Sequence, residues 1–266
     1  MTRTATAAQL PGDDLPRRLN ALGLRGVVEH LDDFENTEWL PRLIEIEEAD
    51  RAQRGLERRL RNAKLGRFTP FADFDATWPK KIDQDQLQEI FTLNFIEEAA
   101  NVILVGPNGV GKTMIAKNLV HQAVLKGHTA RFITASELLN DLAAQETGTA
   151  LTRKLKQYSH WKLLVIDELG YLAASARHGD LLFEVINRRY QEKPIVLTTN
   201  KVFTEWGSVF PSSTCVVTMV DRLIHKAEVL RIEGDSYRVK EAKEREERRK
   251  AKRAKKAKKT TRKRGS

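Results

Sequence analysis

Short apolar runs alternate with stretches of helical spacing through the middle of the chain. Four runs have the length and residue types of buried strands, and they cover residues 102–105, 130–134, 163–167 and 195–199. Helical patterns follow at 112–125, 137–145 and 180–190. Because strands and helices take turns along the chain, we predict an α/β fold in which a parallel sheet is covered by helices on both faces.

The segment before these strands has helical spacing and no strand-like run. Apolar residues within 15–31 recur at helical intervals, although Gly23 and Gly26 weaken the pattern. Two further helices are expected, over 39–48 and 50–66. We therefore expect a small all-helical domain over residues 1–68.

The last of these expected helices has a basic stripe. Four arginines recur at steps of three and four residues: Arg51, Arg54, Arg58 and Arg61. A stripe of this kind can bind the phosphates of DNA, and an ordinary exposed helix face has the same pattern. Both interpretations stay open at this point.

A segment rich in aromatic residues, Asp and Pro separates the helical domain from the strands. Residues 68–83 read FTPFADFDATWPKKID and show no sustained period. We interpret them as an ordered linker whose rings pack onto a neighbouring domain. The linker opens a second domain, which we place at residues 69–239.

The net charge of +10 lies almost entirely in the last part of the chain. Residues 240–264 hold 15 Lys and Arg against 4 Glu, whereas residues 1–239 hold 31 basic and 32 acidic side chains. A tail of this composition has little to bury, so we expect residues 240–266 to be flexible or a lone helix until they meet a polyanion. Candidate DNA contacts there are Arg248, Arg249, Lys250, Lys252 and Arg253; the alternative is a solvated extension.

The clearest motif lies between the first strand and the helix that follows it. Residues 106–113 match the pattern G-x-x-x-x-G-K-[ST], and they are Gly106, Pro107, Asn108, Gly109, Val110, Gly111, Lys112 and Thr113. In such a loop, backbone N–H groups surround phosphates, the lysine reaches the terminal phosphates and the hydroxyl binds Mg²⁺. An incidental Gly-rich turn is the alternative, and the flanking strand and helix favour phosphate binding.

Polar groups also follow two other strands. The strand 163–167 ends in Asp167 and is followed by Glu168, a pair that suits an Mg²⁺ ligand and a base for the attacking water. Asn200 follows the strand 195–199 and could orient that water. The alternatives are a solvated acidic turn and a turn-forming Asn.

Other sequence features limit the class of protein. The single Cys215, and the lack of a leader or of an apolar run of membrane-spanning length, predict a soluble, cytoplasmic protein with no membrane partner. The six histidines lack metal-ligand spacing, so we expect no metal other than the Mg²⁺ of a nucleotide.

These motifs together resemble the IstB-like transposition helpers of insertion sequences, which are relatives of the DnaC-type helicase loaders in the AAA+ superfamily. The resemblance extends over most of residues 15–240 and depends on 22–24, 73–75, 106–113, 131–135, 166–171, 182–183, 189–190, 199–200, 205–206, 221–223 and 235–238. It implies an AAA+ P-loop fold behind the helical domain. On the sequence alone, arginines such as Arg222, at the expected start of a helix, and Arg238 are more often surface residues than catalytic ones.

The resemblance implies roles that spacing does not show. Arg222 would be an arginine finger that reaches the ATP of a neighbouring subunit, and Arg238 would contact the ATP of its own subunit. The implied activity is ATP hydrolysis by a homo-oligomer, a ring or spiral on duplex DNA with little sequence preference, which bends DNA and recruits a transposase. The alternatives are a replicative helicase loader and, more distantly, a non-catalytic DNA-packaging protein that holds ATP as a structural element.

Overall fold

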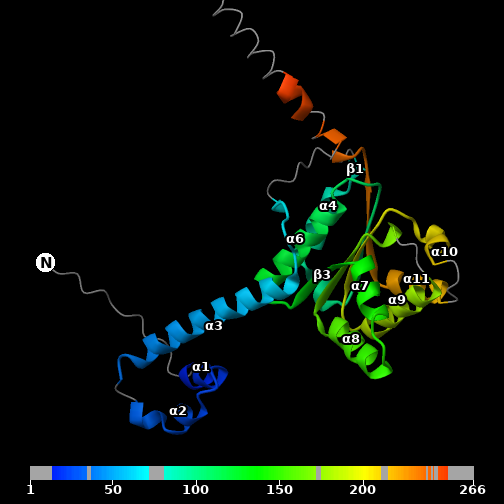
Figure 1. Ribbon diagram of the computed structural model, residues 1–266. Coiled ribbons are helices and arrows are strands. Elements are labelled where there is room, and N and C mark those ends of the chain that lie inside the picture. Colours follow the sequence, from blue (N-terminus) through cyan, green and yellow to red (C-terminus); the bar gives the residue numbers. More distant parts are fainter. Residues whose placement is uncertain are drawn as a thin grey trace, which may run out of the picture. The chain divides into compact units, whose positions relative to one another are not determined.

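The computed structural model describes residues 14–34, 37–71, 81–171, 175–210, 215–237, 239–240, 242 and 245–250 (Figure 1). The chain divides into two compact units, residues 1–58 and 59–266, and the division falls inside one long helix, α3 (Leu40–Ala63). Asp73–Asp75 of the linker, Arg238, Lys252 and Arg253 lie outside the described residues.

The first unit is helical, as the sequence predicts. It contains α1 (Leu15–Ala21), α2 (Arg25–Glu29), the short 3-10 helix η1 (Leu31–Phe34) and the first part of α3. Its core consists of Leu19, Leu22, Leu40 and Ile44. The prediction of one helix over 15–31 was wrong, because the chain turns at Gly23, whose φ of 72° is in the left-handed region that favours glycine. The two helices expected at 39–48 and 50–66 form the single helix α3, since no helix-breaking residue separates them.

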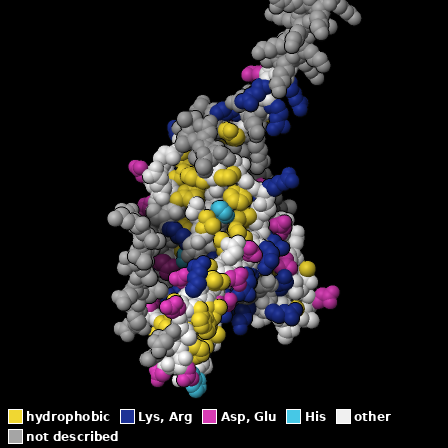
Figure 2. All heavy atoms as spheres, turned by 90° about the vertical axis from the view of Figure 1, so that its left-hand side faces the viewer, with side chains coloured by type: hydrophobic (Ala, Val, Ile, Leu, Met, Phe, Trp, Pro, Cys, Tyr) yellow, Lys and Arg dark blue, Asp and Glu magenta, His cyan; other side chains and the backbone are white. Residues whose placement is uncertain are grey.

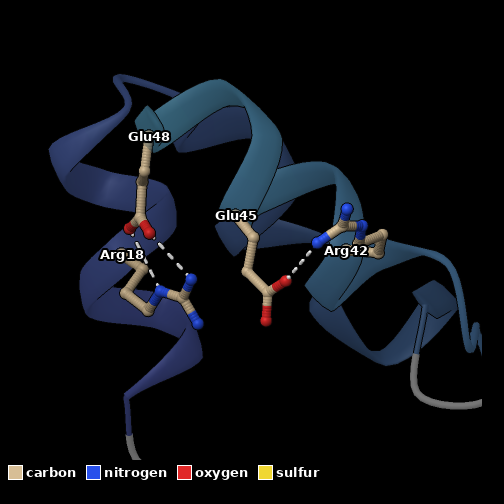
Figure 3. Close-up of polar contacts among 4 residues, drawn as sticks. All are labelled: Arg18, Arg42, Glu45 and Glu48. Carbon is tan, nitrogen blue, oxygen red and sulfur yellow. Dashed lines mark hydrogen bonds and ion pairs between the residues drawn. The ribbon is translucent and has the colours of Figure 1, made fainter. Parts of the chain in front are cut away.

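An ion pair connects α1 to α3 inside this unit (Figure 3). Nε and Nη2 of Arg18 each donate a hydrogen bond to the Glu48 carboxylate, at 3.0 and 2.7 Å. This contact lowers the pKa of Glu48 and raises the pKa of Arg18, chiefly through the hydrogen bond between them. A second pair, Arg42 with Glu45 at 3.0 Å, lies along α3 itself.

The second unit is built on a six-stranded sheet with the order β1-β6-β2-β5-β4-β3. Its strands are β1 (Lys81–Ile82), β2 (Asn101–Val105), β3 (Ala130–Thr134), β4 (Leu163–Asp167), β5 (Ile195–Thr199) and β6 (Ala227–Glu233). Neighbouring strands from β6 to β3 are parallel, and only the edge pair β1–β6 is antiparallel. The four predicted strands are confirmed within one residue, whereas β1 and β6 were not predicted.

Helices cover both faces of this sheet (Figure 1). They are α4 (Gln84–Thr92), α5 (Asn94–Glu97), α6 (Lys112–Leu125), α7 (Ala135–Ala143), α8 (Gly148–His160), α9 (Ala176–Arg189), α10 (Trp206–Val209) and α11 (Val216–Ile224), with 3-10 turns η3 (Leu169–Tyr171) and η4 (Phe203–Glu205). Ile103, Ile133, Ile166 and Leu197 share one buried cluster with α7, α8, α9, α10 and α11. The alternate strand residues point to the opposite face. The α/β prediction is thus confirmed.

The first part of the aromatic linker packs as predicted. The ring of Phe68 lies 5.3 Å from that of His121, and the ring of Phe71 lies 4.2 Å from that of Phe91. The backbone N–H of Phe71 donates to the Asn118 side chain of α6 at 2.8 Å. The linker thereby begins against α6, the helix that follows the P-loop.

Candidate functional site

The P-loop motif forms the connection from β2 to α6. Gly109 and Gly111 have φ of 80° and 100°, values that other residues rarely adopt, and Gly111 is the residue immediately before α6. Gly106 is required for another reason, because a Cβ there would overlap with the carbonyl oxygen of Ile232 in β6. These glycines let the backbone curve tightly in front of a helix N-terminus, which is the geometry that binds phosphate.

The first two residues of α6 complete this loop. Lys112 Nζ donates to the carbonyl oxygens of Gly106 and Pro107, at 2.6 and 2.7 Å, so the ammonium lies within the curve of the loop. Thr113 Oγ1 donates to Asp167 Oδ1 at 3.3 Å. The hydroxyl and the carboxylate therefore face each other across the gap between α6 and the end of β4.

A threonine that the sequence analysis did not select holds the end of β4 in place. Thr198 of β5 is fully buried beside Asp167, and its hydroxyl donates to Asp167 Oδ1. The same hydroxyl accepts the backbone N–H of Glu168 at 2.9 Å. One side chain therefore fixes both the carboxylate of Asp167 and the backbone of Glu168. The available sequence signal was two polar residues, Thr198 and Thr199, at the end of a buried strand whose other residues are apolar.

Glu168 adopts an unusual backbone conformation. Its φ is 62°, in the left-handed region, where a residue with a Cβ costs about 1 kcal/mol or more. Its side chain is exposed, while that of Asp167 immediately before it is 2% exposed. The turn thus separates the two acids, one held inside and one open to water, which is the division expected between a metal ligand and a base.

Asn200 lies beside this turn. Its Oδ1 atom is buried and has no hydrogen-bond partner among the described residues. A Cβ at Gly170 would overlap with that oxygen, so the glycine leaves the space that the amide occupies. A buried acceptor without a partner is costly in a protein and often marks a site where a ligand or an ordered water binds.

The chain returns to the P-loop after β6. The N–H of Tyr237 donates to the carbonyl of Gly109 at 2.9 Å, and a Cβ at Gly109 would overlap with the Ser236 side chain. Residues 236 and 237 thus lie directly against the loop. Arg238 follows them but lies outside the described residues, so its proposed contact with ATP stays a prediction.

Arg222 lies at the other edge of the sheet. The prediction that it opens a helix was wrong: it is in the last turn of α11, which begins at Val216 because an apolar face with Met219 and Leu223 already packs there. Asn101, the first residue of β2, donates its amide to the carbonyl of Leu223 at 2.9 Å. The end of α11 is therefore fixed at the start of β2, whereas the P-loop follows the end of β2.

The candidate DNA contacts of α3 are partly neutralised by neighbouring acids. Arg51 pairs with Glu47 at 2.6 Å, and Arg54 pairs with Asp50 at 2.7 Å. Arg58 and Arg61 form no ion pair with any residue that the structure describes. On the face in Figure 2, basic and acidic side chains are intermingled over much of the surface. Exposed ion pairs such as Arg51–Glu47 and Arg54–Asp50 contribute little to stability and separate readily.

In the tail, residues 245–250 are helical and exposed. Lys250 pairs with Glu246 at 2.7 Å, one turn away. Arg248 and Arg249 are exposed on the same short helix. The basic character of the tail therefore begins on an exposed helix.

The groups around the P-loop fit a magnesium–nucleotide complex. Two positive-φ glycines and a helix N-terminus suit phosphate oxygens, and Lys112 adds a positive charge at the centre of the loop. Thr113 and Asp167 place hard oxygen ligands side by side, as Mg²⁺ requires. The orphaned oxygen of Asn200 lies at the same edge of the sheet.

No helix in the described part of the chain is long and apolar enough to cross a membrane.

Comparison with known proteins identifies a family described as ATP-binding. The model of the family described as IstB-like ATP binding protein matches residues 5–245. An ATP-binding protein of insertion sequence IS5376 from Geobacillus stearothermophilus is 36% identical over 205 residues, which are 77% of this chain and 82% of the relative. One of insertion sequence IS21 from Pseudomonas aeruginosa is 39% identical over 204 residues, 77% of either protein.

Among solved structures, the crystal structure of DnaI resembles this fold with a TM-score of 0.51, at 19% identity over 63% of this chain and 89% of that chain. The likeness concerns the fold alone. The P-loop geometry and the family match over nearly the whole chain lead to one conclusion: this chain belongs to the family of IstB-like ATP-binding proteins.

Proposed function

We propose that this protein is the ATP-hydrolysing helper of an insertion sequence, which assembles on duplex DNA with ATP and recruits a transposase. The observation that carries the proposal is the junction at Asp167, where the hydroxyls of Thr113 and Thr198 meet one buried carboxylate beside the exposed Glu168. The names of the two relatives, ATP-binding proteins of insertion sequences, support the biological setting.

In this proposal the P-loop, residues 106–111, holds the phosphates through backbone N–H groups, and Lys112 contacts the terminal ones. Thr113 and Asp167 hold Mg²⁺, which, when bound, neutralises the charge that develops on the phosphoryl oxygens. Arg238 contacts the nucleotide of the same subunit. The position of Ser236 and Tyr237 against Gly109 supports this last assignment.

Glu168 activates the attacking water in this mechanism, and Asn200 orients it. The exposure of Glu168 supports a role toward water, because an exposed carboxylate can contact the attacking water. The unpartnered oxygen of Asn200 supports a role in accepting a hydrogen bond from water. The two residues act from neighbouring strand ends.

The turnover of ATP by the full chain on duplex DNA tests this assignment. Glu168→Gln should retain ATP binding and lower kcat by about 10²-fold to 10⁴-fold, the usual contribution of a general base. Glu146→Gln is the matched control, because Glu146 is exposed in the segment between α7 and α8. If Glu168→Gln kept more than half of the wild-type kcat, the role of Glu168 would be wrong.

We assign the arginine finger to Arg222 acting on a neighbouring subunit. Within one chain, β2 separates the end of α11 from the P-loop by about 15 Å, at roughly 3.3 Å per residue, and Arg222 extends toward α9 instead. The residue is therefore out of reach of its own site. A finger supplied by a neighbour contributes about 10³-fold to 10⁵-fold in rate, so hydrolysis should require assembly.

DNA contact is assigned to the basic tail, residues 248–264, with help from the α3 stripe. Each phosphate contact adds about 0.9 to the slope of log affinity against log salt. Truncation after Glu247 should therefore flatten this slope measurably. An unchanged slope would exclude the tail as a DNA contact and leave Arg58 and Arg61 as the main candidates.

The helicase-loader alternative would use the same ATPase fold, so the likeness of fold to DnaI does not discriminate between the two functions. Both relatives are named as ATP-binding proteins of insertion sequences, which favours a role in transposition. Co-purification with a transposase, and not with a replicative helicase, is the result that this proposal requires.

A further inference from the structure

The side chain of Arg222 contacts two residues of α9, Phe183 and Asn187, and Tyr190, which caps the C-terminus of that helix. Its guanidinium lies over the ring of Phe183, 4.9 Å from the centroid, and over the ring of Tyr190 at 5.6 Å. Its Nη1 donates a hydrogen bond to Oδ1 of Asn187. We name these three residues, Phe183, Asn187 and Tyr190, the arginine cradle.

The cradle follows from the geometry of α9. Phe183 and Asn187 are four residues apart and share one face of α9, and Tyr190, three residues further on, is the C-cap of the helix. That face is turned toward α11, since Phe183 and Asn187 both contact Arg222 of that helix. Tyr190 is itself held, because its hydroxyl lies 3.1 Å from Nδ1 of His225, the residue after α11. The C-terminal part of α9 and its cap residue therefore hold the guanidinium of α11 from one side.

The cradle leaves most of the guanidinium available. A guanidinium has five N–H donors, and Asn187 takes one of them. Among the described residues no carboxylate pairs with Arg222, and no second hydrogen-bond partner is found. The two rings fix the plane of the group without using its donors.

We propose that Asn187, together with the rings of Phe183 and Tyr190, positions Arg222 for the neighbouring subunit's ATP. The cradle fixes the guanidinium before assembly, so its remaining donors face the phosphoryl group once two subunits meet. Preorganisation of this kind matters because a misplacement of about 1 Å can lower a rate about 10²-fold. The inference rests on the trans role proposed for Arg222, and it assigns positioning rather than catalysis to the three cradle residues.

Two populations of the full chain test this on duplex DNA. The first carries Glu168→Gln and supplies an intact Arg222, and the second carries Arg222→Ala and supplies an intact Glu168. Neither population should turn over ATP alone. A mixture should recover ATP turnover only at interfaces where Arg222 of the first population reaches the ATP site of the second. We then introduce Asn187→Ala into one population at a time.

In the first population, Asn187→Ala should lower the recovered kcat about tenfold, as expected when a hydrogen bond to a charged group is lost. The second population has no Arg222 to misplace, so Asn187→Ala in that population should leave the recovered kcat unchanged. KM for ATP should move little, because the cradle does not contact the nucleotide of its own subunit. Tyr190→Phe keeps the ring and should keep most of the activity, whereas Tyr190→Leu should lose it.

Asn140→Ala is the matched control, an exposed helix position in the same domain. If Asn187→Ala behaved like this control, or lowered activity equally in both populations, the cradle would be a structural feature and the inference would be wrong. If the mixture of the two parent populations recovered nothing, the trans role of Arg222 would fail first, and the positioning role would fail with it.

Discussion

The hydroxyl of Thr198 organises the site, and its removal gives a sharp test. Thr198→Val replaces the hydroxyl with a methyl group of similar shape in a fully buried position. Two hydrogen bonds are lost, one to the Asp167 carboxylate and one from the Glu168 N–H. The substitution therefore removes one hydrogen-bond partner from the buried carboxylate of Asp167 and one from the backbone N–H of Glu168.

The expected loss of stability can be estimated from these contacts. A hydrogen bond to a charged group contributes about 1.5–3 kcal/mol, and an unsatisfied buried donor costs about 1–3 kcal/mol. The added methyl group returns about 0.8 kcal/mol. Because the two losses share one hydroxyl and are not additive, we expect a net destabilisation of about 2–3 kcal/mol.

Urea unfolding of the full chain, followed by tryptophan fluorescence, measures this loss. Thr198→Ser keeps the hydroxyl and should lose less stability than Thr198→Val, and the exposed Thr149→Val is a control expected to change stability by less than about 0.5 kcal/mol. A Thr198→Val protein as stable as this control would refute the idea that the hydroxyl ties Asp167 to Glu168. Weaker ATP binding should accompany the destabilisation.

Three further outcomes follow from the structure. Gly170→Ala should displace Asn200 and lower ATP turnover at least tenfold while ATP binding, measured by calorimetry, persists; equal turnover would contradict the placement of Asn200. Glu168→Gly should remove the left-handed strain and be at least as stable in urea as Glu168→Gln, yet be equally inactive. Arg18 lowers the pKa of Glu48 in the folded protein. Their ion pair therefore stabilises the first unit at pH values above 4.5, the ordinary pKa of Glu, and this stabilisation is lost as the pH falls through the lower pKa of the folded state. Arg18→Met should abolish that acid-side loss in hydrogen exchange of the Leu19 amide, and an unchanged pH profile would show that the pair contributes nothing.

The strands and the P-loop were predictable because their signals are local. Four short apolar runs and one glycine motif are legible without knowledge of the fold. By contrast, β6 was missed because its buried residues alternate with charged ones, as in Leu230-Arg231-Ile232, and two-residue β1 exists only through pairing with β6. Tertiary pairing decides such segments, and local preference does not.

The same distinction applies to the site. Parallel strands bring their carboxyl ends to one edge, so Asp167 and Asn200 could be expected near the P-loop from spacing alone. Which polar residue of β5 touches Asp167 depends on register, because Ile166 pairs with Leu197 and so places Thr198 next to Asp167. The bond from Arg222 to Asn187 joins residues 35 positions apart and depends on how α9 packs on α11.

The central claim is that ATP controls assembly on DNA through a site completed between subunits. Sedimentation of the full chain with duplex DNA, in ATP, in ADP and without nucleotide, tests it most directly. We predict a large complex with ATP only, retained by Glu168→Gln because that variant holds ATP unhydrolysed. A complex of the same mass in all three conditions would contradict the claim.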